Sequence, residues 1–500
     1  MRFCAKMTGK EMLLLTTYIP PVFQPTMKRS SHLRNWRFYL LILSLPLCFA
    51  QTGMSEDEEK KSGPVSYYNQ IRPIFQAKCQ GCHQPAKRGG DYIMTDFADM
   101  LKGGETGQEA IVAGKPEESY LLDLIKPEDG TAEMPKNDKP LVKAEIDLVA
   151  QWIAEGAKND TPKTASTSFD MDNPPQYQVA PQITTIDFSP DGTLLAVSGY
   201  HEVLIFDTKS WVLKHRLVGL SERIESAIFS PDGKKLVVAG GSPGRRGEIQ
   251  IWDMEKIELR LSKGLLYDTL YGASWSPDGK MVAVGCPDNT VRAINIDDGK
   301  EVLFNQTHNG WVMDTTWGLK SEHVVSVSRD MSVKLIEFKT QRFMDNITSI
   351  TPGALKGGLY AVERHPTKNE IVCGGADGVP KIYKMIRDKK RVIGDDHNLI
   401  RKFGTLIGRV YDVKFNHDAT QLAACSSLDG KGELKIFNVA DAKELVKIEV
   451  PEGGLFSCDF SPDGKTVVTG GFDGKLRVID IAQGKISKVF IPVPIQVAAQ

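Results

Sequence analysis

Two cysteines and a histidine stand together in the run Cys79-Gln-Gly-Cys82-His83. Thiols separated by two residues can each add to a vinyl group of haem, and the adjoining imidazole then lies beneath the iron. The motif therefore predicts one covalent haem c, held by Cys79 and Cys82, with His83 as an axial iron ligand. Zinc is an alternative, but zinc favours four ligands and no second Cys or His pair lies nearby. A thioredoxin-like redox pair is another, although no alternating strand and helix pattern surrounds the motif.

Two amphipathic segments flank this motif and predict the helices that position it. In residues 66–77, Ile71, Ile74 and Phe75 fall on one side of a helix that runs into Cys79. In residues 140–157, apolar residues recur at helical spacing, and a proline suits the first turn. We expect these two helices to pack together in one small helical domain.

The order of motifs from residue 64 to residue 159 resembles planctomycete-type cytochrome c domains. The shared features are the haem motif, the run GKPEES from Gly114, a Met-Pro pair at Met134 and the run WIAEGA. This resemblance implies a small all-α haem domain in which the Met134 sulfur is the second axial ligand of the iron. Met94, Met100 and an iron without a sixth ligand are the alternatives.

The rest of the chain is repetitive. The phrase SPDG begins at Ser189, Ser230, Ser276 and Ser461, and each copy follows a strand-like run such as ITTIDF or LFSCDF. Seven such runs align with an aliphatic first column, and their spacing suits four short strands per repeat. Residues 177–496 resemble the WD-repeat family, although Trp252-Asp253 is the one full WD dipeptide. The predicted fold is therefore multidomain: the all-α cytochrome c-like domain followed by an all-β seven-bladed WD-type β-propeller.

Five residues lie where the inner strands of that propeller begin. Tyr, Trp and Arg are the types that most often dominate protein interfaces. We expect them to form a rim that contacts a protein partner; the alternative is that they pack internally or face solvent. They are Arg223, Tyr271, Trp311, Arg409 and Tyr411.

The chain begins with a segment typical of export. A basic stretch from Lys28 precedes an apolar run that ends near Ala50, as in a secretory signal, and Met27 is an alternative start. We expect residues 1–50 to be an extension with a signal peptide, 51–63 to be disordered, 64–160 to be the haem domain and 161–176 a linker. The predicted location is exported, periplasmic or associated with the cell envelope. We expect no membrane-spanning segment unless the signal stays uncleaved.

Composition and charge narrow the function classes. The 500 residues carry a net charge of -1, so the excess of Lys and Arg that a nucleic-acid partner requires is missing. The expected function is an exported c-type cytochrome that transfers single electrons to or from redox partner proteins, with the propeller as a protein-interaction platform, rather than an enzyme. The alternative is an oxidoreductase with a second redox or catalytic centre in the propeller. His201, His308, His323 and His365 are the candidate ligands there; a third possibility is a purely structural propeller.

Overall fold

A computed structural model describes residues 63–84, 87–136, 138–162, 169–349, 356–392 and 394–496. The predicted signal peptide, and all but the last residue of the segment expected to be disordered, lie outside the described residues. The predicted domain boundaries remain predictions. Among the described helices, none is both long and apolar enough to cross a bilayer.

The first described region is mostly helical. Its elements are η1 (Tyr67–Ile71), α1 (Arg72–Lys78), β1 (His83–Gln84), β2 (Lys87–Arg88), η2 (Gly89–Asp91), α2 (Phe97–Lys102), η3 (Pro116–Glu118), α3 (Tyr120–Ile125) and α4 (Lys143–Ala154). β1 pairs with β2 in antiparallel fashion, so the region is not strictly all-α as predicted. The strand pair forms because the chain turns back directly after the haem motif.

Local signals explain where the two main helices begin, and one tryptophan explains how they pack. The Ser66 hydroxyl accepts the N–H of Asn69 at 3.0 Å, and the Glu145 carboxylate accepts the N–H of Val142 at 3.0 Å. Trp152 of α4 is 1% exposed and stacks on the Tyr67 ring, with 5.4 Å between centroids. The same indole meets Phe75 of α1 edge to face. This aromatic contact joins the start of the region to its last helix.

The remaining elements are strands. They are β3 (Ile186–Phe188), β4 (Leu194–Ser198), β5 (Tyr200–Asp207), β6 (Leu213–Phe229), β7 (Lys235–Ser242), β8 (Arg246–Asp253), β9 (Glu258–Leu266), β10 (Tyr271–Trp275), β11 (Met281–Gly285), β12 (Val291–Asn295), β13 (Glu301–Asn305), β14 (Val312–Trp317), β15 (His323–Ser328), β16 (Val333–Glu337), β17 (Arg342–Asn346), β18 (Leu359–Arg364), β19 (Glu370–Gly375), β20 (Lys381–Lys384), β21 (Leu399–Lys402), β22 (Arg409–Phe415), β23 (Gln421–Leu428), β24 (Lys431–Asn438), β25 (Glu444–Val450), β26 (Leu455–Phe460), β27 (Thr466–Gly471), β28 (Leu476–Asp480) and β29 (Lys485–Phe490).

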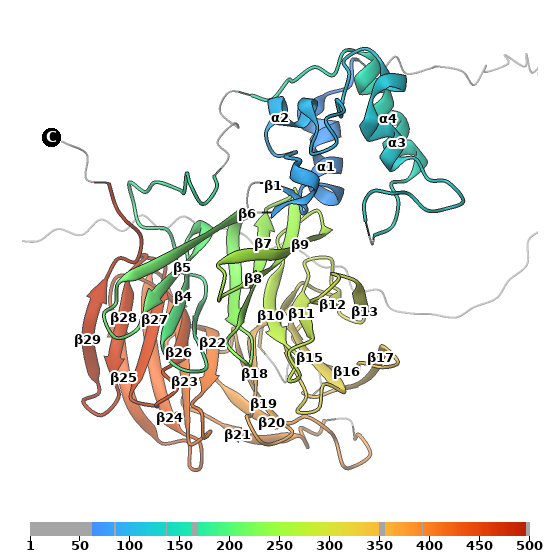
Figure 1. The fold of residues 1–500 in the computed structure, drawn as a ribbon. Coiled ribbons are helices and arrows are strands. Elements are labelled where there is room, and N and C mark those ends of the chain that lie inside the picture. The colour runs from blue at the N-terminus through green and yellow to red at the C-terminus, as the bar shows by residue number, and fades with distance from the viewer. Residues whose placement is uncertain are drawn as a thin grey trace, which may run out of the picture. The chain divides into compact units, whose positions relative to one another are not determined.

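These strands form repeated antiparallel sheets around a common centre (Figure 1). Five sheets have four strands each, and a seven-stranded sheet joins two repeats because β6 is the outer strand of one and the inner strand of the next. Seven four-stranded units result. Each inner strand contacts the next inner strand, and β26 contacts β3, which closes the ring. The predicted WD-type β-propeller is confirmed.

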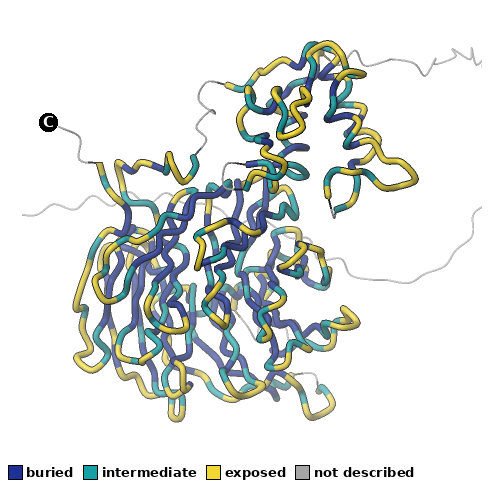
Figure 2. Tube along the Cα trace, viewed as in Figure 1, coloured by how far each residue is buried: buried dark blue, intermediate teal, exposed yellow. Residues whose placement is uncertain are grey.

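The middle strands of the propeller units are mostly buried, whereas many turns between strands and much of the outermost strands β17, β21 and β29 are exposed or half-buried (Figure 2). The SPDG turns show how the sequence sets the start of each second strand. In the first copy, the Ser189 hydroxyl donates to Asp191 at 2.6 Å and accepts the N–H of Leu194 at 2.9 Å. Gly192 follows with φ of 70°, which favours glycine. The same serine-aspartate contact recurs in the other three copies.

Candidate functional site

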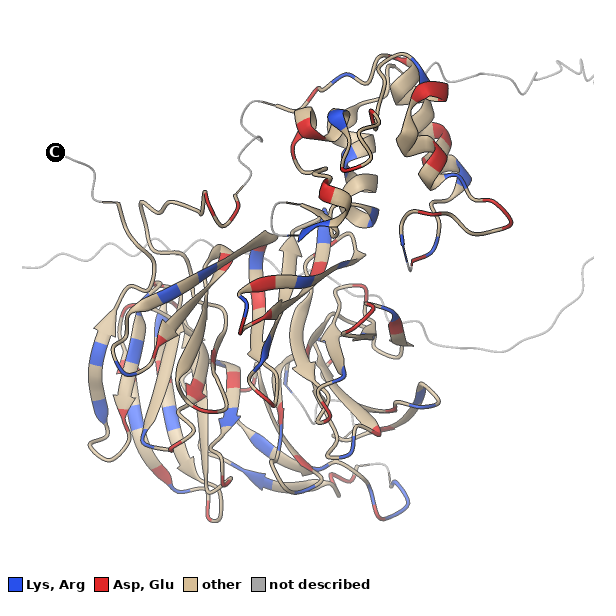
Figure 3. Ribbon diagram, in the orientation of Figure 1, with Lys and Arg blue, Asp and Glu red and all other residues tan. Residues whose placement is uncertain are grey.

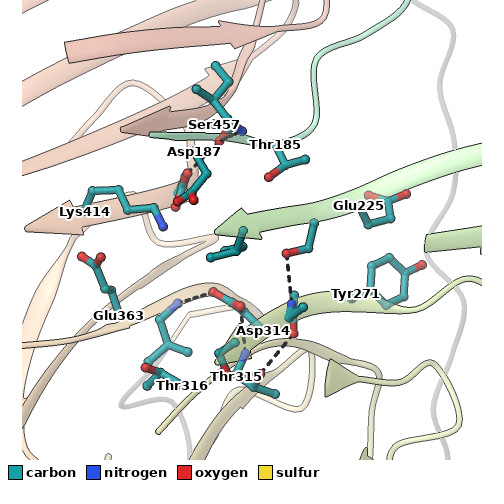
Figure 4. A pocket seen from close by; sticks show the side chains of 18 of the residues that line it. Thr185, Asp187, Glu225, Tyr271, Asp314, Thr315, Thr316, Glu363, Lys414 and Ser457 are labelled. Atoms are coloured by element: carbon teal, nitrogen blue, oxygen red, sulfur yellow. Dashed lines mark hydrogen bonds between the residues drawn. The ribbon is translucent and has the colours of Figure 1, made fainter. Parts of the chain in front are cut away.

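A cavity of about 750 Å³ runs through the centre of the propeller, lined by the inner strands (Figure 4). Its wall includes the carboxylates of Asp187, Asp314, Glu363 and Asp412, which come from four of the repeats. Asp459 of a further repeat is buried close enough to Lys414 for its charge to act on that ammonium. Lys414 of β22 extends its ammonium toward the space between Asp187 and Glu363 (Figure 4). We call this set of six residues the channel cluster.

The carboxylates of the channel cluster join consecutive repeats. Asp187 on β3 accepts the backbone N–H of Phe229 on β6 at 2.7 Å. Asp314 accepts the N–H of Val362 at 2.9 Å. Each of the other three carboxylates also accepts a backbone N–H from the next repeat around the ring. Glu363 accepts from Phe415, Asp412 from Cys458, and Asp459 from Phe188. A buried N–H without a partner is costly, so these bonds favour one arrangement of the ring.

Burial and charge set the protonation of the cluster. Burial raises the pKa of Asp314 to about 7 and that of Glu363 to about 8. Burial opposes the charged form of Lys414, but the carboxylates around it outweigh this effect and hold its pKa above its ordinary value. The cluster is therefore a partly protonated, internally compensated network, and the described residues contain no group of three His, Cys, Asp or Glu suited to a metal ion.

Aromatic and arginine side chains gather at the mouth of the cavity where the inner strands begin. Tyr271 stacks on Trp311 with 5.9 Å between ring centroids, and the Arg329 guanidinium lies 4.7 Å from the Trp311 centroid. On the neighbouring repeats, the Arg409 guanidinium lies 4.5 Å from the Tyr360 centroid. We call this surface the crown; it comprises Tyr271, Trp311, Arg329, Tyr360, Arg409, Tyr411 and Phe456.

The structure brings four of the five predicted rim residues into the crown. The fifth, Arg223, lines the same cavity and pairs with Glu225 at 2.9 Å, with no ring contact among the described residues. Sequence reasoning missed Tyr360, Phe456 and Arg329. The first two occupy the same column of the inner-strand alignment as Tyr411, so an aromatic second column could have identified them. Arg329 follows β15, where no repeat signal points to it.

The haem motif lies directly after α1. The N–H of Cys82 donates to the carbonyl of Cys79 at 3.1 Å, and that of His83 donates to the same carbonyl at 3.2 Å. This tight turn brings both cysteines and the histidine onto one short loop, and both thiols are free. His83 then enters β1, and its ring meets Tyr92 with 5.3 Å between centroids.

The chemistry of these groups fits a thioether-bound porphyrin better than a thiolate metal site. The His83 Nδ1 atom is buried without a hydrogen-bond partner among the described residues, and burial lowers the pKa of the ring, which keeps it neutral and able to ligate. Burial also raises the pKa of the Cys79 thiol to about 12, with Cys82 adding to the effect. A zinc or redox thiolate requires the opposite shift.

The three methionines weighed as iron ligands differ in burial. Met94 and Met100 are 1% and 0% exposed and belong to the core of the helical region. Met134 is only partly buried and lies at the edge of the same core, as Cys79 does. Its backbone N–H donates to the carbonyl of Leu124 at 2.9 Å, which fixes the loop that carries it.

The histidines considered for a second centre do not line the propeller cavity. His308 is buried, and its two ring nitrogens contact Asp330 at 2.9 Å and Ser326 at 2.8 Å. The Nδ1 atom of His365 accepts two N–H groups of its own turn. These two rings are occupied by structural hydrogen bonds, so the structure offers no support for an additional haem there.

Different parts of the chain match the models of different protein families. The model described as planctomycete cytochrome C matches residues 79–138. The model described as WD domain, G-beta repeat matches residues 177–207 and 443–480, and that of the anaphase-promoting complex subunit 4 WD40 domain matches residues 268–320. The chain thus contains a planctomycete cytochrome C segment and WD40 repeats, as the sequence resemblance indicated.

Relatives are found among eukaryotic proteins. The chain is 24% identical to periodic tryptophan protein 2 of Saccharomyces cerevisiae over 346 residues, covering 62% of this chain and 35% of that protein. It is 21% identical to the protein of the same name from Arabidopsis thaliana over 318 residues, with 61% and 32% covered. It is 21% identical to eukaryotic translation initiation factor 3 subunit I of Candida glabrata over 270 residues, with 51% and 65% covered. The chain spans about a third of the length of the first two relatives.

These relatives correct the predicted function and location. None of the three is named as an exported protein or as an electron carrier, so the prediction of an exported c-type cytochrome that transfers electrons is wrong. The periplasmic or cell-envelope location and the signal peptide are corrected with it, as is the description of the whole chain as a cytochrome. The physical reason is that a CxxCH motif places two thiols and an imidazole within reach of one porphyrin, but fixes neither compartment nor reaction.

Proposed function

We propose that this chain is an interaction protein whose WD-type propeller binds a protein partner through the crown. The observation that carries the proposal is the set of stacked aromatic and arginine side chains that five consecutive repeats bring to one mouth of the central cavity. Trp, Tyr and Arg supply large contact area and directional hydrogen bonds at interface centres.

The scaffold beneath the crown supports this role. The carboxylate bonds of the channel cluster hold neighbouring inner strands in register, so the crown residues at the start of those strands are presented on a rigid base. Rigid aromatic side chains lose little entropy when they are covered. One relative is named as a subunit of a larger factor, which supports a protein partner for a similar propeller.

The test is recovery of partners from the cells that make this protein. Tagged wild-type chain, Trp311→Ala and Arg409→Ala would be purified in parallel, with Val489→Ala as the matched control, because Val489 is exposed on the outermost strand β29. We expect both crown variants, but not the control, to lose a stoichiometric partner. Equal recovery with all four proteins would overturn the proposal.

We also propose that the helical region binds one haem c. Cys79 and Cys82 would hold it through thioether bonds, and His83 and Met134 would be the axial ligands. The free thiols on one loop, the partnerless His83 Nδ1 and the partly buried position of Met134 support this assignment. When bound, the group would supply an iron centre with one imidazole and one thioether ligand. The partner redox proteins expected from the sequence are not part of the proposal.

Covalent attachment gives this second proposal a direct test. The chain would be produced in a host that attaches haem to CxxCH motifs, then denatured in acid and examined by intact mass and pyridine haemochrome spectrum. We expect one haem per chain, and none in the variant with both Cys79→Ser and Cys82→Ser. Two alkylatable thiols and no Soret absorbance in the wild-type chain would contradict it. Met134→Leu is expected to change the spectrum of the bound group, whereas Met94→Leu is not.

A further inference from the structure

Several acidic side chains at the crown end of the propeller are already paired within the chain. In the antiparallel units, the turn between the second and third strands lies at the same end as the start of the inner strand. Several of these turns carry an aspartate that contacts a basic residue nearby. The pairs are Asp288 with Arg292, Asp377 with Lys381, and Asp473 with Arg477. Their charges are therefore largely compensated.

Two crown arginines differ from this pattern. Arg329 and Arg409 are exposed and lie over aromatic rings, and among the described residues neither has a carboxylate within 4.0 Å. Stacking on Trp311 and Tyr360 orients each guanidinium plane. One N–H group of Arg409 donates to the Tyr411 hydroxyl at 3.4 Å, and its remaining N–H groups are left for a partner. Such a preorganised donor fork matches the geometry of a carboxylate.

Exposed apolar side chains lie at the same end of the propeller as the two arginines. Trp311 is 39% exposed, Leu428 49% and Phe472 56%. All three lie at the crown end: Trp311 precedes β14, Leu428 ends β23, and the Phe472 N–H donates to the carbonyl of Gly454 just before β26. Apolar side chains gathered at one end of a soluble protein generally mark a binding surface. The partner must therefore offer both apolar and anionic groups.

From this complementarity we propose that the crown binds an acidic segment of another protein, in which Asp or Glu side chains lie beside Leu or Phe side chains. The inference rests on the proposed function of the propeller and adds the chemistry of the partner. The carboxylates contact Arg329 and Arg409, and the apolar side chains cover Trp311, Leu428 and Phe472.

The channel cluster beneath the crown does not favour a basic partner instead. Its carboxylates accept backbone N–H groups of the neighbouring strands and face Lys414, so they are already engaged. Over the propeller as a whole, residues of both signs are interspersed (Figure 3). Arg329 and Arg409 have no carboxylate partner among the described residues, so their charges are open to a partner at the mouth.

A peptide selection tests this proposal. A display library of random 12-residue peptides would be panned on the full chain, and the most enriched peptide synthesised with a fluorescent label. Its Kd would be measured by fluorescence polarisation for wild type, Arg329→Gln, Arg409→Gln and Trp311→Ala. Lys488→Gln is the matched control. Lys488 also lies over an aromatic ring, that of Trp211, but it belongs to the outermost strand β29 and not to the crown.

We expect enrichment of Asp or Glu next to Leu, Phe or Trp, and a Kd weakened about tenfold or more by each arginine substitution but not by Lys488→Gln. Basic or uncharged peptides that still require Trp311 would overturn the acidic partner while the proposed function stands. Peptides insensitive to all crown variants, or no enrichment at all, would overturn the inference too. The inference would also be overturned if the wild-type chain forms a dimer through the crown and Trp311→Ala dissociates that dimer. If Arg409→Gln lowers the melting temperature, Arg409→Lys replaces it, since it keeps the charge and loses the fork.

Discussion

The carboxylate of Asp459 accepts the backbone N–H of Phe188 at 2.7 Å, and this bond joins the last repeat of the propeller to the first. Its donor and acceptor are 271 residues apart in the chain, so it is made only when the ring closes. The equivalent bond from Asp187 to Phe229 joins the first repeat to the second. Ring closure in this propeller thus uses side chain to backbone hydrogen bonds inside the channel.

Removing that closing bond should destabilise the whole propeller. In Asp459→Ala, the Phe188 N–H loses its acceptor, which we expect to cost about 1–3 kcal/mol of unfolding free energy. Asp459→Asn retains an acceptor oxygen and should cost less. Urea unfolding monitored by circular dichroism measures the unfolding free energy of both variants. An alanine variant as stable as wild type would show that the bond does not contribute to closure.

The contribution of Glu363 to stability should fall as the pH rises from about 5 to about 8. Burial raises the folded-state pKa of Glu363 to about 8, above its ordinary value of 4.5. The folded chain therefore binds more protons than the unfolded chain in this range, and that stabilisation is lost as the pH rises through the folded pKa. Glu363→Gln cannot titrate, so its melting temperature should fall less steeply over the same range. Parallel slopes for the two proteins would contradict this account.

Lys414 should matter most at high pH. Lys414→Met leaves the carboxylates of the channel cluster without their ammonium, and repulsion grows as they ionise. We expect a lower melting temperature than wild type at pH 8 and a smaller difference at pH 5. Adding Glu363→Gln to Lys414→Met should restore part of the loss at pH 8. A deficit independent of pH would instead indicate a packing defect.

Trp152 should be required for the helical region. It is 1% exposed and contacts both Tyr67 and Phe75, so Trp152→Ala should cost about 3–5 kcal/mol. Hydrogen exchange measured by mass spectrometry should show α1 and α4 losing protection while the propeller strands keep theirs. Leu148→Ala is the milder comparison, because Leu148 is only partly buried at the edge of the same core. Unchanged protection of α1 in Trp152→Ala would contradict this role.

The repeat pattern made the propeller predictable because each strand has a local signature. The aliphatic column that begins with Ile183 is buried, and the Ser189 turn forms as its residues require. The helix expected over 140–157 appears as α4, since apolar spacing and the Glu145 cap act within a few residues.

The channel cluster could not be found in this way. Asp187, Glu363 and Lys414 occupy one column of the aligned inner strands, but that column mixes charge signs and apolar residues, so no repeat pattern marks it. Their function as links between repeats depends on which strand is the neighbour in space. Arg329 was not predicted as a crown residue for a similar reason. Its ring partner, Trp311, lies just before the neighbouring strand of the sheet, β14, and is not close to it in sequence. Function was mispredicted because a cofactor motif carries no information on the partner of the rest of the chain.

Site-specific photo-crosslinking tests the central claim, that the crown binds a protein, most directly. A benzophenone amino acid would replace Tyr360 in the crown or Val489 on β29, and the chain would be irradiated in its own cells. The account predicts a discrete crosslinked product with another protein from position 360 and none from position 489. Products from position 489 alone, or the same products from both positions, would contradict it.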